Sequence, residues 1–318
     1  IPMALSSSGT FAGAASFPSP DLWSPENPAL YTLRVTFKDS KGAVLDQVAQ
    51  KFGFREFWAQ GPDFYLNGVK RHLLATSTWP SNDPISLAEA KAVLLRSKAG
   101  NNVAIRFHTQ PWRELWLQAA DEVGMMVVDE AAFWCDSAGA YAYGNPRFWQ
   151  NYKTHLEAMV RRDRQHSSVV MWSLENELLH CGAARYDPNV EQNLGFMARF
   201  VRDLDPTRLL TFEADLDPAG QADVIGLHYP HEMPDFTDYP NTADWLGSET
   251  VTGTGGGILG SRSASFRWDR RKPLYIGEYL WVPASGPYPG TVFFGDEAFT
   301  NPDAFHQKAQ AAAWVDQI

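Results

Sequence analysis

From about residue 62 onward, short apolar runs of the sequence alternate with amphipathic stretches. This order is typical of a fold in which each strand of a parallel sheet is followed by a helix. The candidate strands are residues 71–74, 102–107, 125–129, 169–174, 209–212, 224–227 and 274–277. Because no glycine fingerprint follows the first strand, the pattern favours a (β/α)8 TIM barrel over a doubly wound, dinucleotide-binding sheet. An eighth unit is not visible, so we expect the barrel to be truncated in this chain.

Several stretches between these strands carry helix start signals. Ser86 and Glu89 form a capping box, in which each side chain bonds a backbone amide of the other residue. The pairs Asn145-Pro146, Asp187-Pro188 and Asn301-Pro302 each place an N-cap residue before a proline at the first helical position. One predicted helix buries a single face, because apolar residues recur at helical spacing at Leu194, Met197, Val201 and Leu204.

The first 58 residues follow a different pattern, with short alternating runs broken by Pro, Gly, Ser and Asn. Residues 30–37 and 44–54 are predicted to pair as antiparallel strands around a turn at 39–42. Two strands alone do not make a stable sheet. We therefore predict two domains, with the last strands of a β-sandwich over residues 1–58 and the (β/α)8 barrel over residues 59–318.

The composition narrows the classes of partner. A formal net charge of −10 argues against nucleic acid, which requires a clustered basic face on the protein. No run of about 18 apolar residues appears, so a membrane-spanning helix is not expected. The two cysteines, Cys135 and Cys181, are interpreted as small buried hydrophobic residues, with one disulfide between them as the alternative.

Two candidate strands end in acidic residues. The run 169–174 leads through Asn176 to Glu177, and the run 274–277 leads directly to Glu278. In a barrel of this type the reacting groups lie at the carboxyl ends of the strands, so both glutamates are expected at one mouth. Cleavage of a glycosidic bond uses such a pair. One carboxylic acid protonates the leaving oxygen, and one carboxylate attacks or activates water.

Several segments together resemble glycoside hydrolase family 2. RRDRQHSSVVMWSLENE at 161–177 is similar to the family's R-x-H-x-S segment followed by W-S-x-G-N-E. KPLYIGEY at 272–279 resembles its nucleophile strand, and LWSPENPALYTLRV at 22–35 resembles the end of its immunoglobulin-like domain. FGFREF at 52–57 is similar to the link into the barrel, and FYLNGVK at 64–70 to the first barrel turn. The resemblance spans essentially the whole chain and implies a retaining β-glycosidase.

The resemblance also implies roles for single residues. Glu177 matches the general acid/base, Glu278 the nucleophile, and Asn176 the residue that binds the sugar 2-hydroxyl. Arg106 matches the arginine that keeps the nucleophile ionised, since an adjacent guanidinium lowers the pKa of a carboxyl group. Glu177 must start protonated, so burial or the negative charge of Glu278 is expected to raise its pKa. Further substrate-site candidates from the same match are His108 and Tyr229.

The sequence departs from the family pattern near the site. The His pair usual after the first barrel strand is missing from RHLLATSTWP, and Glu175 stands where glycine is usual. These changes put the identity of the sugar in doubt more than the reaction. Asp129 and Glu130, which end the third candidate strand, are additional acidic candidates for a supporting or structural role. Tryptophans that can stack on a sugar are Trp281, Trp112 and Trp79, followed by Trp134 and Trp245.

These features predict retaining hydrolysis of β-glycosidic bonds. The specificity expected first is that of a β-galactosidase, and the alternatives are β-mannosidase, β-glucuronidase or endo action on a polysaccharide. The expected partner is a carbohydrate rather than nucleic acid or a membrane, with no cofactor and no metal. Two other classes stay open, a barrel that binds carbohydrate without activity and a metal-dependent hydrolase. The sequence starts without a signal-peptide pattern. An extracellular or periplasmic location is favoured over a cytoplasmic one, and the oligomeric state is left open.

Overall fold

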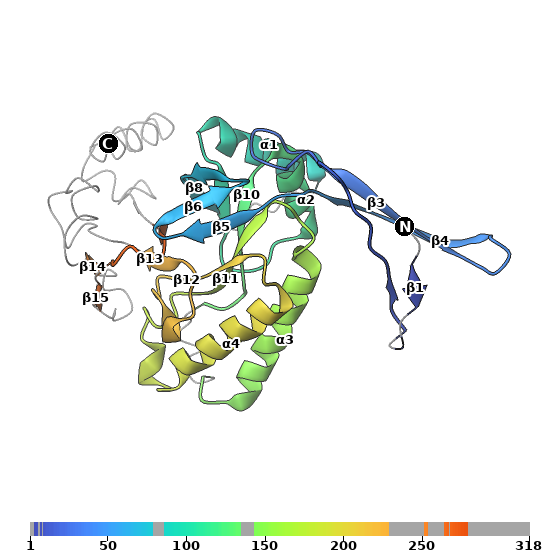
Figure 1. The fold of residues 1–318 in the computed structure, drawn as a ribbon. Helices are drawn as coiled ribbons and strands as arrows, with labels where there is room; N and C mark the ends of the chain where they lie inside the picture. The colour runs from blue at the N-terminus through green and yellow to red at the C-terminus, as the bar shows by residue number, and fades with distance from the viewer. Residues whose placement is uncertain are drawn as a thin grey trace, which may run out of the picture.

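The computed structural model describes residues 3–5, 7, 9–78, 86–134, 143–228, 251–253, 264–266 and 268–278. Within these residues, the largest sheet is parallel and has the spatial order β12-β11-β10-β9-β8 (Figure 1). Its strands are β8 Ala75–Thr78, β9 Ala104–Phe107, β10 Met126–Glu130, β11 Val169–Asn176 and β12 Leu209–Glu213. A second parallel pair, β13 Ile225–His228 and β16 Leu274–Glu278, lies beside β12. The amide of Val224, just before β13, bonds the carbonyl of Leu210 on β12.

Side chains along the barrel strands alternate between the helices and the barrel interior. On β9, Ile105 and Phe107 belong to the core under the helices, whereas Ala104 belongs to a second core inside the barrel. On β10, Val127 lies in the first core and Val128 in the second. Because both faces of the sheet are buried, the strands are nearly continuous apolar runs, and this is what made them visible in the sequence.

The α-helices of the described residues flank this sheet (Figure 1). They are α1 Leu87–Ala99, α2 Glu114–Val123, α3 Pro146–Asp163 and α4 Val190–Leu204. The predicted capping box of Ser86 and Glu89 is present at the start of α1. At α3 the Asn145 side chain accepts a hydrogen bond from the amide of Arg147, with Pro146 in the first turn. Short 3₁₀ turns at η3 Ala183–Arg185 and η4 Pro218–Gly220 complete the described helical segments.

Helix α4 begins later than its start signal predicts. The pair Asp187-Pro188 forms a turn before the helix, because Asp187 Oδ1 accepts the amide of Asn189 at 2.9 Å. The helix then starts at Val190 and buries Leu194, Met197 and Val201, as their spacing predicts. The remaining helix signal, Asn301-Pro302, lies outside the described residues.

The chain before the barrel is made of short antiparallel sheets. The predicted strand pair is confirmed as β3 Tyr31–Lys38 and β4 Val44–Phe52, which extend to one side of the barrel in Figure 1. Next come β5 Phe57–Gln60, β6 Asp63–Leu66 and β7 Val69–Arg71. The first barrel strand is therefore wrong as predicted at 71–74, because Arg71 still pairs with Phe64 and the parallel strand β8 starts at Ala75. The leading segment also contains the antiparallel pair of β1 Ala4–Leu5 and β2 Phe11–Ala12. A further antiparallel pair, β14 Val251–Gly253 and β15 Ala264–Phe266, lies between β13 and β16 in the sequence.

The leading segment is anchored to the barrel by Trp23. This side chain is fully buried, and its indole nitrogen donates to the carbonyl of Asp121 on α2 at 2.9 Å. Gly53 is required beside it, because an added Cβ would lie 2.7 Å from Ser167 Oγ and 2.9 Å from the Ala29 carbonyl oxygen. The end of the leading segment and the barrel therefore share one core.

Two further findings concern the cysteines and the length of the helices. Cys181 is disulfide-bonded, so its interpretation as a small hydrophobic residue is wrong, and Cys135 lies outside the described residues. Across the described helices, none is both long and apolar enough to cross a bilayer.

Candidate active site

Arg106 is the centre of a buried network at the carboxyl ends of the barrel strands. Its side chain is fully buried on β9, and it bonds three acidic or amide side chains. NH1 donates to Glu278 Oε1 at 2.8 Å, Nε donates to Glu130 Oε2 at 2.7 Å, and NH2 donates to Asn176 Oδ1 at 2.6 Å. Burial opposes its charge, but the carboxylates of Glu130, Glu213 and Glu278 raise the pKa of Arg106 well above its usual value. A permanent cation therefore lies against Glu278, as the arginine match predicts.

The two acidic residues that end β10 face opposite ways, because successive side chains on a strand alternate. Glu130 faces the site and bonds both Arg106 and the Ser173 hydroxyl, the latter at 2.9 Å. Asp129 faces α3, where burial and the neighbouring Asp163 carboxyl raise its pKa well above the usual range. Glu130 thus supports Arg106, and Asp129 is a structural residue outside the site.

Glu177 follows β11 in a constrained turn. Its φ is +60°, a left-handed conformation that is uncommon for residues other than glycine. The Glu177 amide donates to the Glu213 carbonyl at 2.9 Å, and its carbonyl accepts the Cys181 amide at 2.8 Å. Trp134 adds a side-chain contact, with its indole nitrogen 3.3 Å from Glu177 Oε2. Strained backbone of this kind persists where surrounding bonds hold it, and it concentrates at functional sites.

Two buried carboxyl groups hold the turn that follows Glu177. Glu175 Oε2 accepts the amide of Leu178 at 2.9 Å, and the Asp215 carboxylate accepts the amides of Leu179 and His180 at 2.5 and 2.7 Å. Burial raises the pKa of Asp215 to about 7, and burial together with Asp215 raises the pKa of Glu175. A proton shared between these two groups fits this arrangement, because two buried carboxylates do not both ionise readily.

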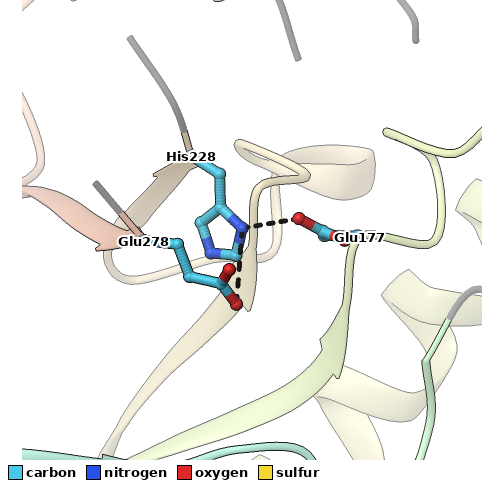
Figure 2. Close-up of side chains that lie close together, drawn as sticks. All are labelled: Glu177, His228 and Glu278. Carbon is cyan, nitrogen blue, oxygen red and sulfur yellow. Dashed lines mark hydrogen bonds and ion pairs between the residues drawn. The ribbon is translucent and has the colours of Figure 1, made fainter. Parts of the chain in front are cut away.

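His228 lies between the two predicted catalytic glutamates (Figure 2). Its Nδ1 is 3.0 Å from Glu177 Oε1 and 4.0 Å from Glu278 Oε1, and its Nε2 is 3.0 Å from Glu213 Oε2. Burial alone would lower the pKa of His228, but the bonds to Glu177 and Glu213 and the charge of Glu278 raise it to about 9. The ring is therefore a second buried cation at this mouth.

The spacing of the two glutamates bears directly on the chemistry. One carboxylate oxygen of Glu177, one of Glu278 and one His228 nitrogen all lie within 4.8 Å of one another. Three such atoms are also close enough for one metal ion. Hydrogen bonding already accounts for their placement, since His228 Nδ1 is bonded to Glu177, and we assign no metal ligand among them.

The structure brings together most of the predicted site residues that it describes. Glu177, Glu278, Asn176 and Arg106 meet in one network, and His108 joins it with Nε2 at 4.0 Å from Glu278 Oε1. Tyr229, Trp281, Trp79 and Trp245 lie outside the described residues.

Trp112 is an exception, because the structure buries it. It is 4% exposed, its ring stacks on Phe107 with centroids 4.7 Å apart, and Trp116 meets it edge-on at 4.8 Å. Phe107 faces the helices, so Trp112 continues the core and presents no open face to a sugar. The prediction of a sugar platform is wrong for this residue.

Sequence reasoning missed Glu213 and His228 as parts of the site. Both had a usable signal, since Glu213 ends the apolar run LLTFE and His228 ends IGLH, the same pattern that singled out Glu278. A third omission is a hydrogen-bonding role for Trp134, which was predicted only as a sugar platform.

Comparisons with known proteins agree with this geometry. The sequence matches the family model described as "Glycosyl hydrolases family 2, TIM barrel domain" over residues 53–318, and "Glycosyl hydrolases family 2" over residues 4–55. The chain belongs to glycosyl hydrolase family 2. The predicted (β/α)8 barrel after a sandwich domain is thereby confirmed, whereas the predicted boundary between residues 58 and 59 stays a prediction.

Individual relatives carry several names. A β-galactosidase of Psychromonas ingrahamii is 30% identical over 240 residues, which are 71% of this chain and 21% of that protein. A putative β-glucuronidase of Formosa agariphila is 32% identical over 63% of this chain and 19% of its own length. The crystal structure of an Eisenbergiella tayi β-galacturonidase superposes with a TM-score of 0.66 at 22% identity, covering 85% of this chain and 46% of that one. The chain thus spans about a fifth of the two curated relatives, and the structural match shows the fold.

Proposed function

We propose that this chain carries the reaction centre of a retaining β-glycosidase, with Glu278 as the nucleophile and Glu177 as the general acid/base. The observation that carries the proposal is the approach of one oxygen of each glutamate to within 4.8 Å. Retaining glycosidases have carboxyl groups about 5–5.5 Å apart, and inverting ones about 6.5–9.5 Å. The bond from Arg106 NH1 to Glu278 Oε1 supports the division of roles, because it favours the ionised form of that group.

In the first step, a Glu278 oxygen attacks the anomeric carbon while the bond from that carbon to the leaving oxygen breaks. Glu177 transfers its proton to the departing oxygen, so the aglycone leaves as a neutral alcohol. The products of this step are a glycosyl ester of Glu278 and a Glu177 carboxylate.

In the second step, Glu177 takes a proton from water as the water oxygen bonds the anomeric carbon. The ester bond to Glu278 breaks, which restores the Glu278 carboxylate and a protonated Glu177. Asn176, whose Oδ1 is held by Arg106 NH2, is oriented to bind the sugar 2-hydroxyl through its amide group. Such a contact accelerates the reaction when it strengthens in the transition state.

For the substrate, we propose a β-linked sugar with β-galactoside first and β-glucuronide second. The support is the naming of relatives, a β-galactosidase and a putative β-glucuronidase. A panel of aryl β-galactosides, β-glucuronides and β-mannosides measured with the full-length protein ranks these sugars directly. We also propose an extracellular or periplasmic location, which the disulfide at Cys181 supports because such bonds persist in oxidising compartments.

Azide rescue tests the assignment of Glu177. In Glu177→Ala the first step still proceeds with an activated aryl leaving group, and azide then attacks the glycosyl ester without needing a base. We expect faster turnover with added azide and a β-configured glycosyl azide as the product. An α-configured azide would overturn the retaining assignment. Activity that falls on treatment with a chelator would instead favour the metal-dependent alternative, and a wild-type protein that binds sugars without cleaving them would favour the inactive barrel.

A further inference from the structure

His228 is bonded to carboxylates at both ring nitrogens. Nδ1 and Nε2 each lie 3.0 Å from a carboxylate oxygen, of Glu177 and Glu213 respectively. An ionised carboxylate only accepts hydrogen bonds, so whenever Glu177 and Glu213 are both ionised, as after the first step of the reaction, both nitrogens must carry a proton for both contacts to be favourable. In that state the contacts fit an imidazolium rather than either neutral tautomer.

The space for this contact is provided by the strand that carries Glu278. A Cβ on Gly277 would lie 1.7 Å from Glu213 Oε2 and 2.7 Å from His228 Nε2. The Glu213–His228 pair thus occupies the volume that any other residue at 277 would fill. A glycine directly before the nucleophile is what allows a cation to be buried beside it.

We propose that His228 is a positioning residue, which holds Glu177 through a charged hydrogen bond and stabilises its carboxylate form. The inference rests on the proposed function of Glu177. Trp134 donates to the other oxygen, Oε2, so the two side chains fix the plane of the carboxyl group from both sides. Glu177 then releases its proton more readily in the first step, and its ionised form is held in position for the second. Glu213 keeps His228 in place and charged.

Other titratable groups also face His228. Besides Glu177 and Glu213 they are Glu278 on β16, with an oxygen 4.0 Å from Nδ1, Arg106 on β9, whose charge opposes protonation of the ring, and His180 in the turn after Glu177. Three carboxylates surround the ring, so the attraction they exert exceeds the repulsion from Arg106.

Two near-isosteric variants separate the hydrogen bond from the charge. His228→Asn keeps a donor near the Nδ1 position, facing Glu177, and His228→Gln keeps one near the Nε2 position, facing Glu213. Both remove the positive charge. His166→Gln is the matched control, because His166 is also buried and bonded to a carboxylate, Asp121, but lies at the opposite end of β11.

The measurement is kcat/KM against pH for the full-length protein, with aryl β-glycosides of good and poor leaving groups. We expect both His228 variants to move the alkaline limb to higher pH by roughly one to three units, because loss of a nearby cation makes Glu177 a weaker acid. We expect His228→Gln, which loses the bond to Glu177, to depend more steeply on leaving-group quality than His228→Asn. His166→Gln should keep the wild-type profile.

The inference is overturned if folded His228→Asn and His228→Gln keep the wild-type alkaline limb and lose activity equally on good and poor leaving groups. That result would make His228 a packing residue. If one variant fails to fold, the alkaline limb of the other still tests the inference, since both variants lose the positive charge. Failure of the proposed function is recognised separately, because wild-type hydrolysis would then survive Glu278→Ala.

Discussion

The two ends of strand β11 both bury charged side chains, but they satisfy them differently. The carboxyl end meets an excess of acids, with the carboxyl groups of Glu130, Glu177, Glu213 and Glu278 around the cations Arg106 and His228. At the amino end, Arg55, Arg208 and His166 lie near Asp121 and Asp205.

The two ends of β11 differ in the groups that hydrogen-bond the charged side chains. At the amino end, Arg208 donates to the backbone carbonyls of Val169, Arg164 and His166 at 2.6–2.8 Å, as well as to Asp205. Carbonyl oxygens do not titrate, so these bonds hold the fold at any ordinary pH. At the carboxyl end the partners are themselves titratable, and more acids are present than cations. Protons must then be shared and moved, which is the requirement of acid/base chemistry.

The largest change in activity is expected when the proposed nucleophile at the carboxyl end of the barrel strands is removed. We expect Glu278→Ala to lower kcat by about 10⁴-fold or more, the range seen when a nucleophile is removed. The free energy of unfolding should change far less, because the variant removes one acid from a cluster that has an excess of them. Steady-state kinetics and urea unfolding of the same sample measure both quantities. Residual activity within tenfold of wild type would contradict the assignment.

Arg208→Ala is the matching change at the other end of β11. Removing one member of a buried, bonded charge pair costs about 3–5 kcal/mol of stability, and Asp205 would be left without this partner. Activity per folded molecule should stay within about twofold of wild type. A fall in kcat without a fall in stability would show that the amino end contributes to catalysis, and the contrast between the two ends would then fail.

The Glu175–Asp215 pair predicts how stability depends on pH. The native pKa of Asp215 is raised to about 7 from an ordinary value of 3.8. Its contribution is therefore full below about pH 4 and is lost as the pH rises to about 7, since only the native state stays protonated in that window. Glu175→Gln imitates a protonated carboxyl group, so we expect it to flatten this part of the curve. The contribution of one proton is at most about 1.4 kcal/mol per pH unit.

Chemical unfolding at intervals between pH 4 and pH 8 gives that curve. Other carboxyl groups, such as Glu122, have lowered pKa values, so their contribution to stability changes with pH in the opposite direction. The informative quantity is therefore the difference in the free energy of unfolding between the wild type and Glu175→Gln at each pH. Parallel curves for the two proteins would mean that Glu175 and Asp215 do not share a proton.

The smallest effect on activity is expected at Trp112. Trp112→Phe removes part of a packed side chain, so stability should fall by about 1–2 kcal/mol. KM for aryl β-glycosides should change less than twofold, because the ring lies in the core with Phe107 and Trp116. A severalfold rise in KM at unchanged kcat would restore the earlier interpretation as a sugar platform.

Local patterns in the sequence predicted the elements that local forces determine. The barrel strands appeared as apolar runs, and the capping box at Ser86 and the N-cap at Asn145 were both found. The predictions were wrong where a contact with a distant part of the chain overrides the local pattern. The first barrel strand moved to Ala75 because Arg71 pairs with β6, and Trp112 was taken for a surface residue although it packs in the core.

The sequence by itself determined the order of strands and helices and the acids that end two of the strands. These follow from short-range periodicity and from the rule that strands of a parallel barrel present their carboxyl ends at one mouth. The family resemblance already paired Arg106 with Glu278, whereas only the tertiary structure decided that Glu213 and His228 join them. The bond from Arg106 to Glu278 spans 172 residues and that from His228 to Glu177 spans 51, so no local pattern encodes either contact. Closure of the barrel brings them together, and their burial makes each charge depend on the others.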